Sequence, residues 1–248
     1  MHRHPDTFLQ LNKLGSEIPP YQPNYDFPGL FVNAFQRGIS NYPLQDGILI
    51  QRKNRRWFGK VMPGWLRCED ALKLYELCYF AEGDILELGS YHGLSTSIIA
   101  QAVRDSKRPR RIFTVDISHS AINETKRNLR SLRLVRNVAT LCSDALSATK
   151  GFAAESSRFG FIFIDHAHDF QSVYEVCREL ENIVLPGAFC LFHDFNDFRN
   201  GDPDCKDYAV YQGVVQGLDQ AQFEFWGVYG CTGLYRARHD QDSRNSRS

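Results

Sequence analysis

The sequence predicts an α/β protein built on a doubly wound, mostly parallel sheet with helices on both faces. Five apolar runs recur at intervals that suit a strand, a crossover helix and two short loops. The segments between these runs place apolar residues at helical spacing, so each predicted helix has one face for the sheet. Two further apolar runs flank a short turn near the C-terminus and predict a closing antiparallel hairpin. The five runs begin near Ile85, Ile112, Ala139, Phe161 and Ala188.

The order of the elements follows from local signals along the chain. A helix is predicted to begin near Ser95, directly after the first strand, and helical spacing recurs after the second and fourth strands. The pair Pro186-Gly187 is expected to end the helix after the fourth strand and to turn the chain into a central strand over 189–192. The last elements are a helix near 208–218 and hairpin strands over 223–228 and 232–236.

The chain of 248 residues is long enough for one α/β domain with a segment left over. We expect this domain over residues 66–237 and a polar, disordered tail over 238–248. Residues 1–65 are rich in Pro, Asn, Gly and aromatic side chains, with one convincing strand at 48–50. We interpret them as an extension or lid on the substrate side. Their aromatic residues are equally consistent with a small core or a homodimer contact.

Composition narrows the choice of compartment and partner. Lys plus Arg and Asp plus Glu each number 29, so no overall field attracts nucleic acid or an anionic membrane. The N-terminus lacks the apolar core of a signal peptide, and no apolar run is long enough to span a bilayer. The seven cysteines include no C-x-x-C pair, which gives a structural zinc site little support. We therefore expect a cytoplasmic enzyme with reduced cysteines and no membrane partner.

The most informative segment is 83–96, which reads as a buried strand, a glycine-bearing turn and the start of a helix. Gly89 and Gly93 allow the backbone to approach a ligand closely, and the helix N-terminus offers unpaired N–H groups to an anion. A dinucleotide-binding turn would have its second glycine at position 91, where this chain has Tyr91. The spacing Glu-x-Gly-x-x-x-Gly therefore favours a nucleotide-type cofactor other than NAD.

The run ELGSYHGLS over 87–95 resembles the first motif of class I methyltransferases that depend on S-adenosyl-L-methionine (SAM). The resemblance extends over about residues 66–237 and implies a Rossmann-like, seven-stranded, mostly parallel sheet with a C-terminal antiparallel hairpin. It also implies that Asp116, after the second strand, holds the ribose hydroxyls and that Asp144, after the third, meets the adenine amino group. The residues implied to contact the cofactor are Glu87, Gly89, Ser90, Tyr91, Gly93, Ser95, Asp116, Ile117, Ser143, Asp144, Ala145, Asp165 and His166.

Each of these signals alone is weak. Gly-x-x-x-Gly is a common spacing, and an Asp after a strand is usually a turn former or a helix N-cap. The three motifs in the expected order are a much stronger indication of a SAM site.

Ionisable residues crowd the ends of the fourth and fifth predicted strands, where open α/β sheets bind ligands. The runs Asp165-His166-Ala167-His168 and His193-Asp194 resemble those of small-molecule O-methyltransferases, including the catechol type and the family labelled methyltransferase 24. The resemblance implies that Asp165 and Asp194 hold a divalent metal such as Mg²⁺. It also implies that His168 stands where catechol enzymes have a lysine base. A metal there would lower the pKa of an acceptor hydroxyl and orient its oxygen toward the methyl group.

The chain departs from the catechol-type pattern after the second acidic residue. Those enzymes usually have Asn next, whereas here Phe195 follows and Asn stands only at position 196. Metal dependence is therefore open at this point. His193 is an alternative ligand, which would favour a transition metal such as Mn, Fe or Zn.

Simpler interpretations exist for these ionisable residues. Asp165 is also explained as a contact to the amino group of the cofactor, or as the cap of a helix that begins near Asp169. His166, His168 and His193 are each explained as hydrogen-bonded loop histidines.

The predicted function is SAM-dependent methyl transfer to a small molecule, with a hydroxyl oxygen favoured by the two histidine–aspartate runs. An RNA methyltransferase is the first alternative, because basic residues accompany aromatic residues over 52–58 and recur over 127–133. Against it, the Asn/Asp-Pro-Pro-aromatic motif of nucleic-acid amino-methyltransferases does not follow the fourth strand. A SAM-binding partner protein that has lost catalysis is the second alternative.

Overall fold

The computed structural model describes residues 44–45, 48–49, 62–66 and 68–239. Most of the predicted N-terminal extension and nearly all of the predicted tail lie outside the described residues. Within the extension, β1 (Leu44–Gln45), β2 (Ile48–Leu49) and β3 (Met62–Pro63) form a small antiparallel sheet in the order β1-β2-β3. The strand expected at 48–50 therefore corresponds to β2.

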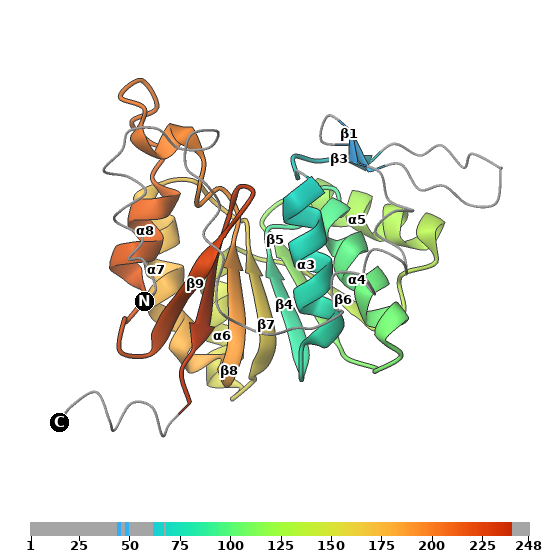
Figure 1. Ribbon diagram of the computed structural model, residues 1–248. Helices are drawn as coiled ribbons and strands as arrows, with labels where there is room; N and C mark the ends of the chain where they lie inside the picture. The colour runs from blue at the N-terminus through green and yellow to red at the C-terminus, as the bar shows by residue number, and fades with distance from the viewer. Residues whose placement is uncertain (1–43, 46–47, 50–61, 67, 240–248) are drawn as a thin grey trace.

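The main sheet has seven strands in the order β6-β5-β4-β7-β8-β10-β9 (Figure 1). β4 to β8 run parallel, and β10 lies antiparallel between β8 and β9. This arrangement confirms the predicted Rossmann-like sheet with its C-terminal antiparallel hairpin. Strand order reverses between β4 and β7, the kind of position at which open α/β sheets bind ligands. The strands are β4 (Asp84–Leu88), β5 (Ile112–Asp116), β6 (Val138–Cys142), β7 (Phe159–Ile164), β8 (Val184–Phe192), β9 (Phe223–Tyr229) and β10 (Thr232–Ala237).

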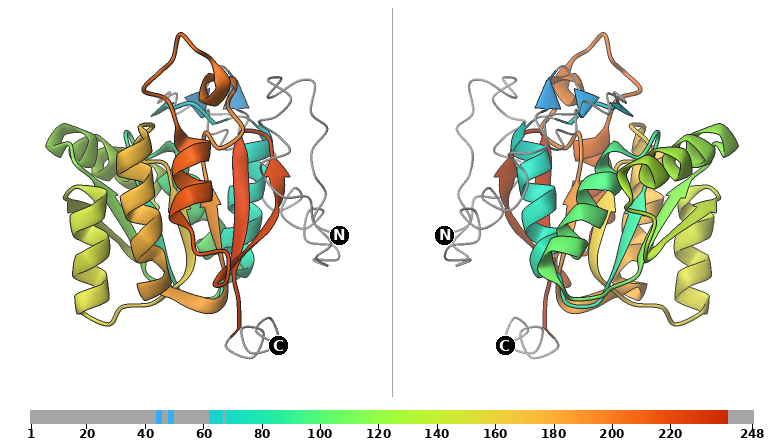
Figure 2. Two further views of the ribbon diagram at one scale, coloured as in Figure 1. Left: turned by 90° about the vertical axis from the view of Figure 1, so that its left-hand side faces the viewer. Right: turned by 90° about the vertical axis from the view of Figure 1, so that its right-hand side faces the viewer.

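Helices cover both faces of this sheet, with α3, α4 and α5 on one side and α6, α7 and α8 on the other (Figures 1 and 2). Local sequence determines where several of them begin. The side chains of Ser118, Asp144 and Asp169 each accept a backbone N–H at the start of α5, α6 and α7. The helices are α3 (Cys68–Phe80), α4 (Leu94–Ser106), α5 (His119–Leu132), α6 (Ala145–Ala154), α7 (Phe170–Glu179) and α8 (Val210–Gly217). Among the described residues, no helix is long and apolar enough to cross a membrane.

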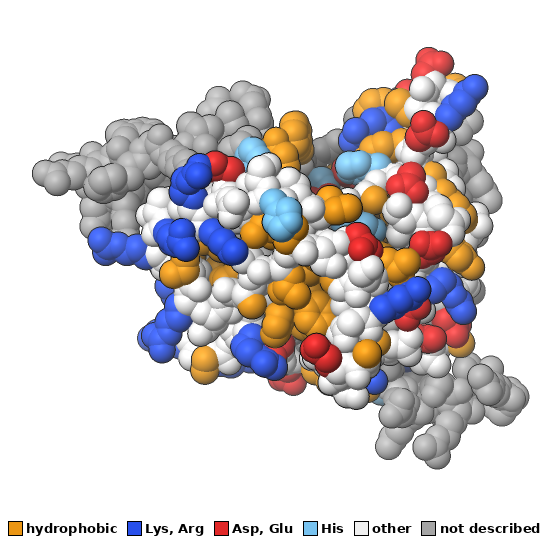
Figure 3. Space-filling view, turned by 180° about the vertical axis from the view of Figure 1, so that it is seen from behind, with side chains coloured by type: hydrophobic (Ala, Val, Ile, Leu, Met, Phe, Trp, Pro, Cys, Tyr) orange, Lys and Arg blue, Asp and Glu red, His pale blue; other side chains and the backbone are white. Residues whose placement is uncertain are grey.

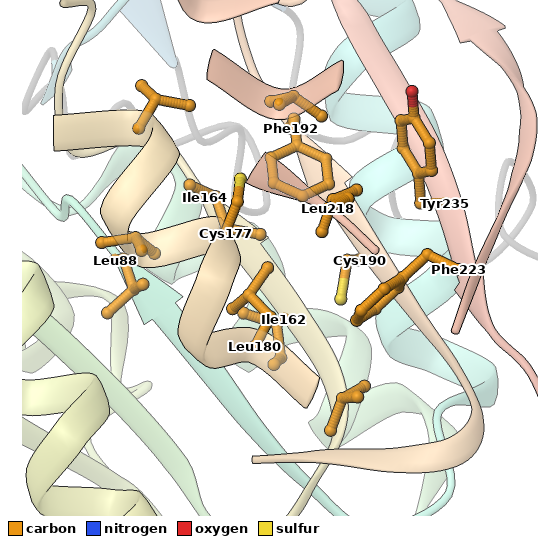
Figure 4. Close-up of a cluster of buried hydrophobic side chains, with 14 of the residues drawn as sticks. Leu88, Ile162, Ile164, Cys177, Leu180, Cys190, Phe192, Leu218, Phe223 and Tyr235 are labelled. Atoms are coloured by element: carbon orange, nitrogen blue, oxygen red, sulfur yellow. The ribbon is translucent and has the colours of Figure 1, made fainter. Parts of the chain in front are cut away.

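The central strand β7 has no polar side chain because both of its faces are buried. Successive side chains of a strand point to opposite faces, so Phe161 and Phe163 of β7 join the core beneath α3 and α4. Ile162 and Ile164, which alternate with them, join the core beneath α6, α7 and α8 (Figure 4). This two-sided burial holds the strand ends at a common edge, where the ionisable residues lie.

One predicted boundary is wrong. The pair Pro186-Gly187 does not end a helix, because α7 ends at Glu179, a short 3₁₀ turn follows over Leu180–Asn182, and β8 begins at Val184. The pair lies inside β8, where the register with β7 shifts between Phe159 and Phe161. A proline is tolerated at such an irregularity because its missing N–H removes no regular ladder hydrogen bond.

Candidate active site

A pocket of about 250 Å³ opens at the ends of β4, β5 and β6 and beside the start of α7. Its volume is slightly below the usual range of small-molecule sites. The predicted cofactor residues that line it are Gly89, Asp116, Ile117, Ser143, Asp144, Ala145 and His166. The predicted residues that do not line it are Glu87, Ser90, Tyr91, Gly93, Ser95 and Asp165.

Gly89 lies where the residues after β4 closely approach the residues after β7. Its φ is +95°, and a Cβ at this position would lie 2.0 Å from the backbone oxygen of Asp165. Only glycine fits both the conformation and the space. The close approach that the sequence predicts at Gly89 is therefore made to the protein's own backbone, directly beside the pocket.

The turn after Gly89 is supported by its own backbone and by α5. The N–H of Gly93 donates to the oxygen of Ser90 at 2.7 Å, and Thr125 Oγ1 of α5 donates to the oxygen of Tyr91 at 3.1 Å. Ser90 and Ser95 are buried, whereas Tyr91 is exposed. Gly93 has a φ of +87°, and a Cβ there would press on Thr125. The second glycine of the motif thus serves the packing of α5 against the turn.

Asp116 links the ends of β4 and β5. One carboxylate oxygen accepts the backbone N–H of Tyr91 at 2.8 Å, and the other accepts that of Ser118 at 2.9 Å. A carboxylate has about four acceptor positions, so both oxygens retain capacity for ribose hydroxyls.

Asp144 caps α6, as an Asp after a strand commonly does. Its Oδ1 accepts the N–H of Ser147 at 2.9 Å, and this hydrogen bond lowers the pKa of the carboxyl. Asp144 also lines the pocket, so one side chain combines the capping position with the position expected for adenine recognition.

Glu87 is fully buried behind the turn. Its Oε2 accepts hydrogen bonds from the hydroxyls of Thr96 and Thr114, each at 2.5 Å. Burial raises the pKa of Glu87 to about 7, although the hydroxyl hydrogen bonds act in the opposite direction. The charge of this buried carboxyl therefore changes near neutral pH.

His166 is the histidine that faces the pocket. Its Nε2 lies 3.3 Å from the oxygen of Ser172, at the start of α7. Burial lowers the pKa of His166, which favours the neutral imidazole at neutral pH.

The second group of predicted residues meets where β7 and β8 end. Asp165, His168 and Asp194 place one ligand atom each within 4.8 Å of one another. His168 Nε2 lies 2.9 Å from Asp194 Oδ2, and the hydrogen bond to Asp194 raises the pKa of His168. His168 is about half exposed, with 50% of its side chain accessible, so the imidazole is within reach of a ligand.

Asp194 occupies an unusual backbone conformation for a residue other than glycine. Its φ is +58°, which turns its carboxylate away from the direction of β8 and toward the cluster. Burial opposes its ionisation, but His168 and His193 hold the pKa of Asp194 well below its usual range. Asn200 Nδ2 donates to the Asp194 backbone oxygen at 2.8 Å and so supports the turn.

His193 is buried between three carboxylates. Its Nδ1 lies 3.2 Å from Asp165 Oδ1 and 3.4 Å from Asp194 Oδ1, and its Nε2 lies 3.5 Å from Asp70 Oδ2. Burial opposes its charge, but the carboxylates, Asp165 foremost, hold the pKa of His193 well above its ordinary value. The three carboxylates therefore favour the charged form of the His193 imidazole.

The loop between β8 and α8 forms one wall of the cluster. Arg199 pairs with both carboxylate oxygens of Asp197 and lies over the ring of Tyr208 at 4.1 Å. The ring of Tyr208 in turn stacks on His168, with centroids 5.0 Å apart. The loop thus fixes the plane of the His168 ring from the side opposite β7.

Residues 195 and 196 explain the departure from the catechol-type pattern. Phe195 is buried in an aromatic cluster with Tyr211, Phe225 and Tyr235. Asn196 Nδ2 donates to the backbone oxygen of Gly230 in the hairpin turn. Asn196 therefore joins β8 to the hairpin, and the third ligand atom beside the Asp165–Asp194 pair comes from His168.

Sequence reasoning missed five residues of this site: Asp70, Asp197, Arg199, Tyr208 and Cys231. Cys231 approaches the cluster from the hairpin, with its sulfur 3.6 Å from Asp194 Oδ1. Asp197 could have been found from its place three residues after Asp194. No local signal marks the others. Arg199 and Tyr208 lie farther along the loop that carries Asp197, whereas Asp70 and Cys231 reach the cluster from α3 and from the hairpin turn.

The alternative explanation of Asp165 as a helix cap is wrong, because Asp169 itself caps α7 through the N–H of Ser172 at 2.9 Å. Asp165 faces His193 instead.

Comparison with known proteins supports a methyltransferase. Residues 86–195 match the family model Methyltransf_24, which is described as a methyltransferase domain. No curated protein is significantly similar to the chain in sequence.

Solved structures share the fold over most of the chain. The O-methyltransferase TomG from Streptomyces achromogenes, in complex with SAM, is 17% identical with a TM-score of 0.60 over 88% of this chain and 92% of its own. The O-methyltransferase from Bacillus cereus, in complex with SAH, is 16% identical with a TM-score of 0.59 over 95% of this chain and 100% of its own. A candidate rRNA methylase from Clostridium thermocellum is 14% identical with a TM-score of 0.51 over 67% of this chain and 95% of its own. At these identities the similarity establishes a common fold and leaves the acceptor open.

Proposed function

We propose that this chain, a SAM-dependent methyltransferase whose residues 86–195 match the Methyltransf_24 domain, methylates a hydroxyl oxygen of a small molecule. The observation that supports this choice is that the segment 165–168 contributes residues both to the pocket and to the carboxylate–histidine cluster. His166 and Ala167 line the pocket of about 250 Å³, while Asp165 and His168 belong to the carboxylate–histidine cluster. A cavity for the cofactor and a set of acid–base groups therefore lie on two sides of one short segment.

The pocket is the proposed site of SAM. Asp116 would bind the ribose hydroxyls and Asp144 the adenine amino group, since both carboxylates line the pocket at successive strand ends. The backbone at Gly89 would lie beneath the methionine part. The remaining predicted contacts, including Tyr91 and Ser95, stay predictions, because their side chains do not line this pocket.

His168 is the proposed base. Its Nδ1 would take the proton of the acceptor hydroxyl as that oxygen bonds to the methyl carbon and the carbon–sulfur bond of SAM breaks, leaving SAH, while Nε2–H stays bound to Asp194 Oδ2. Asp194, 2.9 Å away, would stabilise the imidazolium formed in this step. Tyr208, stacked on the imidazole, would keep the ring in the plane required for the transfer.

The donor set of Asp165, His168 and Asp194 fits a divalent cation. Neighbouring ligand atoms of an octahedral site with bonds of about 2.1 Å lie roughly 3 Å apart, and His168 Nε2 and Asp194 Oδ2 are separated by 2.9 Å. Two carboxylates with one imidazole suit Mg²⁺ less well than Mn²⁺ or another transition metal. Such an ion would supply Lewis-acid activation of the acceptor hydroxyl, with His168 as its ligand in place of its role as base.

An RNA acceptor is the second candidate. Arg127, Arg130 and Arg133 are exposed along α5. On the face shown in Figure 3, Lys and Arg gather mainly on one side, while histidines lie near the upper edge. An inactive SAM-binding partner protein is the third candidate, and only a transfer assay separates it from an enzyme.

The proposal is tested by calorimetric titration of metal-stripped protein with SAH, repeated after addition of Mg²⁺ or Mn²⁺. We expect micromolar binding that Asp116→Ala weakens, and a separate metal-binding heat that Asp194→Asn removes. Methyl transfer from SAM to a panel of small hydroxylated compounds, with RNA as a parallel substrate, then identifies the acceptor class. The absence of SAH binding would contradict the cofactor site, and transfer to RNA alone would contradict the small-molecule acceptor.

A further inference from the structure

Asp70 reaches the carboxylate–histidine cluster from a helix that carries none of the predicted site residues. It lies near the start of α3 and is fully buried, with 0% of its surface exposed. Its Oδ2 lies 3.5 Å from His193 Nε2. Its Oδ1 accepts the backbone N–H of Cys231 at 2.7 Å, which joins α3 to the hairpin turn. A buried carboxylate in this place needs polar partners, and the Cys231 N–H and the His193 ring are two groups that lie beside its oxygens.

The two nitrogens of His193 face different partners. Nε2 faces Asp70, whereas Nδ1 faces Asp165 Oδ1 at 3.2 Å and Asp194 Oδ1 at 3.4 Å. The His193 backbone is fixed by the sheet, because its N–H donates to the oxygen of Ile164 at 2.9 Å. The orientation of the ring about its side-chain torsions therefore depends on the carboxylates at both of its edges, and Asp70 is the carboxylate at the Nε2 edge.

We infer that Asp70 is a positioning residue, which holds the Nε2–H of His193 so that Nδ1 faces the gap between Asp165 and Asp194. Carboxylates opposite a histidine commonly fix its ring orientation and the nitrogen that carries the proton. This inference deepens the proposed function, since it rests on the Asp165–Asp194 gap as the place where the acceptor and a divalent cation would bind.

The hairpin turn between β9 and β10 contacts both Asp70 and Asp194 through Cys231. Cys231, whose N–H binds Asp70 Oδ1, also places its sulfur 3.6 Å from Asp194 Oδ1 and 3.7 Å from Asp197 Oδ2. A shift of α3 relative to the hairpin would thus disturb His193 and Asp194 together. The two oxygens of Asp70 have different neighbours, since Oδ1 binds the hairpin and Oδ2 faces the imidazole of His193.

The variant Asp70→Asn should keep the contact with the hairpin and change the contact with His193. The amide oxygen can still accept the N–H of Cys231, while the amide NH₂ places donor hydrogens against His193 Nε2. In metal-free protein we expect the ¹⁵N signal of His193 Nε2, assigned by its loss in His193→Gln, to shift more than that of Nδ1. We expect the Mn²⁺ affinity measured by calorimetry to fall about 10- to 100-fold, with SAH affinity changed less than twofold. Asp105→Asn is the matched control, since this carboxylate binds Tyr75 and Gln101 and should leave both readouts unchanged.

A double-mutant cycle shows whether Asp70 acts through His193. In the His193→Gln background, Asp70→Asn should cause no further loss of Mn²⁺ affinity. An equal loss in both backgrounds, or an unchanged His193 signal, would overturn the inference and leave Asp70 as a structural partner of the hairpin. If Asp70→Asn does not fold, Asp70→Glu displaces the same carboxylate and should shift the same signal. If the unmutated protein binds no Mn²⁺, the metal part of the proposed function fails, while the metal-free spectra still decide the role of Asp70.

Discussion

The two halves of the ligand-binding edge are built in different ways. At the ends of β5 and β6, Asp116 and Asp144 accept backbone N–H groups from the turns that follow them. At the ends of β7 and β8, the ionisable groups bind one another across long sequence separations, as His168 does with Asp194 and His193 with Asp70. In the proposed cofactor half each carboxylate thus binds the turn after its own strand, and Asp116 also binds the N–H of Tyr91 in the turn after β4. The proposed acid–base half exists only after the elements have packed.

The largest effect is predicted at Gly89, where the cofactor half contacts the acid–base half. A Cβ at Gly89 would lie 2.0 Å from the Asp165 oxygen, and the residue has a φ of +95°. We expect Gly89→Ala to lower the free energy of unfolding by roughly 3 kcal/mol or more, because both the Gly89 backbone and the adjacent Asp165 backbone must shift. Denaturant titration measures this loss, and a decrease below about 1 kcal/mol would contradict the close contact between the two backbones.

Gly151 provides the control for this substitution. It lies in α6, and outside that helix no atom of the described residues comes within 4 Å of the position that a Cβ would take. Gly151→Ala should raise the free energy of unfolding by roughly 0.5–1 kcal/mol, as expected for an exposed helical glycine.

The buried Glu87 predicts a pH dependence of stability in the cofactor half. Its folded pKa of about 7 lies above the ordinary glutamate value of 4.5, so the folded state binds the proton more tightly than the unfolded state. The stability that this group contributes is complete below pH 4.5 and falls by about 3 kcal/mol as the pH rises to 7 and above.

Glu87→Gln should remove that slope, because glutamine keeps an acceptor for the two threonine hydroxyls and cannot ionise. Denaturant titrations of both proteins between pH 4.5 and 8 test this expectation. The difference in unfolding free energy should grow with pH in favour of the variant. Parallel profiles would show that Glu87 has an ordinary pKa.

His168→Ala tests the acid–base half. We expect turnover to fall at least tenfold, equivalent to about 1.4 kcal/mol, while SAH affinity hardly changes. His119→Ala is the control, since this histidine is exposed at the start of α5. Unchanged turnover on an identified acceptor would remove His168 from the mechanism.

The smallest effect is expected at Asp144, where a substitution tests whether this residue only caps α6 or also binds the cofactor. Asp144→Ala should lower the free energy of unfolding by about 1 kcal/mol through loss of the α6 cap, and should also weaken SAH binding. Asp169→Ala, which removes the equivalent cap of α7, should cost a similar amount without weakening SAH. An SAH affinity that is equal in the two variants would leave Asp144 as a cap alone.

The core and the sheet could be predicted because their signals are periodic and redundant. The run from Phe161 to Ile164 is apolar at every position, which indicates burial on both faces wherever the strand lies. The Pro186-Gly187 pair shows the limit of such reasoning. A helix stop and a strand irregularity have the same local composition, and only the pairing of β8 with β7 distinguishes them.

The sequence by itself determined the α/β class and the local turn and cap that follow Asp116 and Asp144, because these depend on neighbours within a few positions. Only the tertiary structure decided that Asp70 and Cys231 meet His193 and Asp194. Their sequence separations reach 161 residues between Asp70 and Cys231. The physical reason is that a buried charge is stabilised by whichever opposite charge folding brings beside it, and no local pattern records that partner.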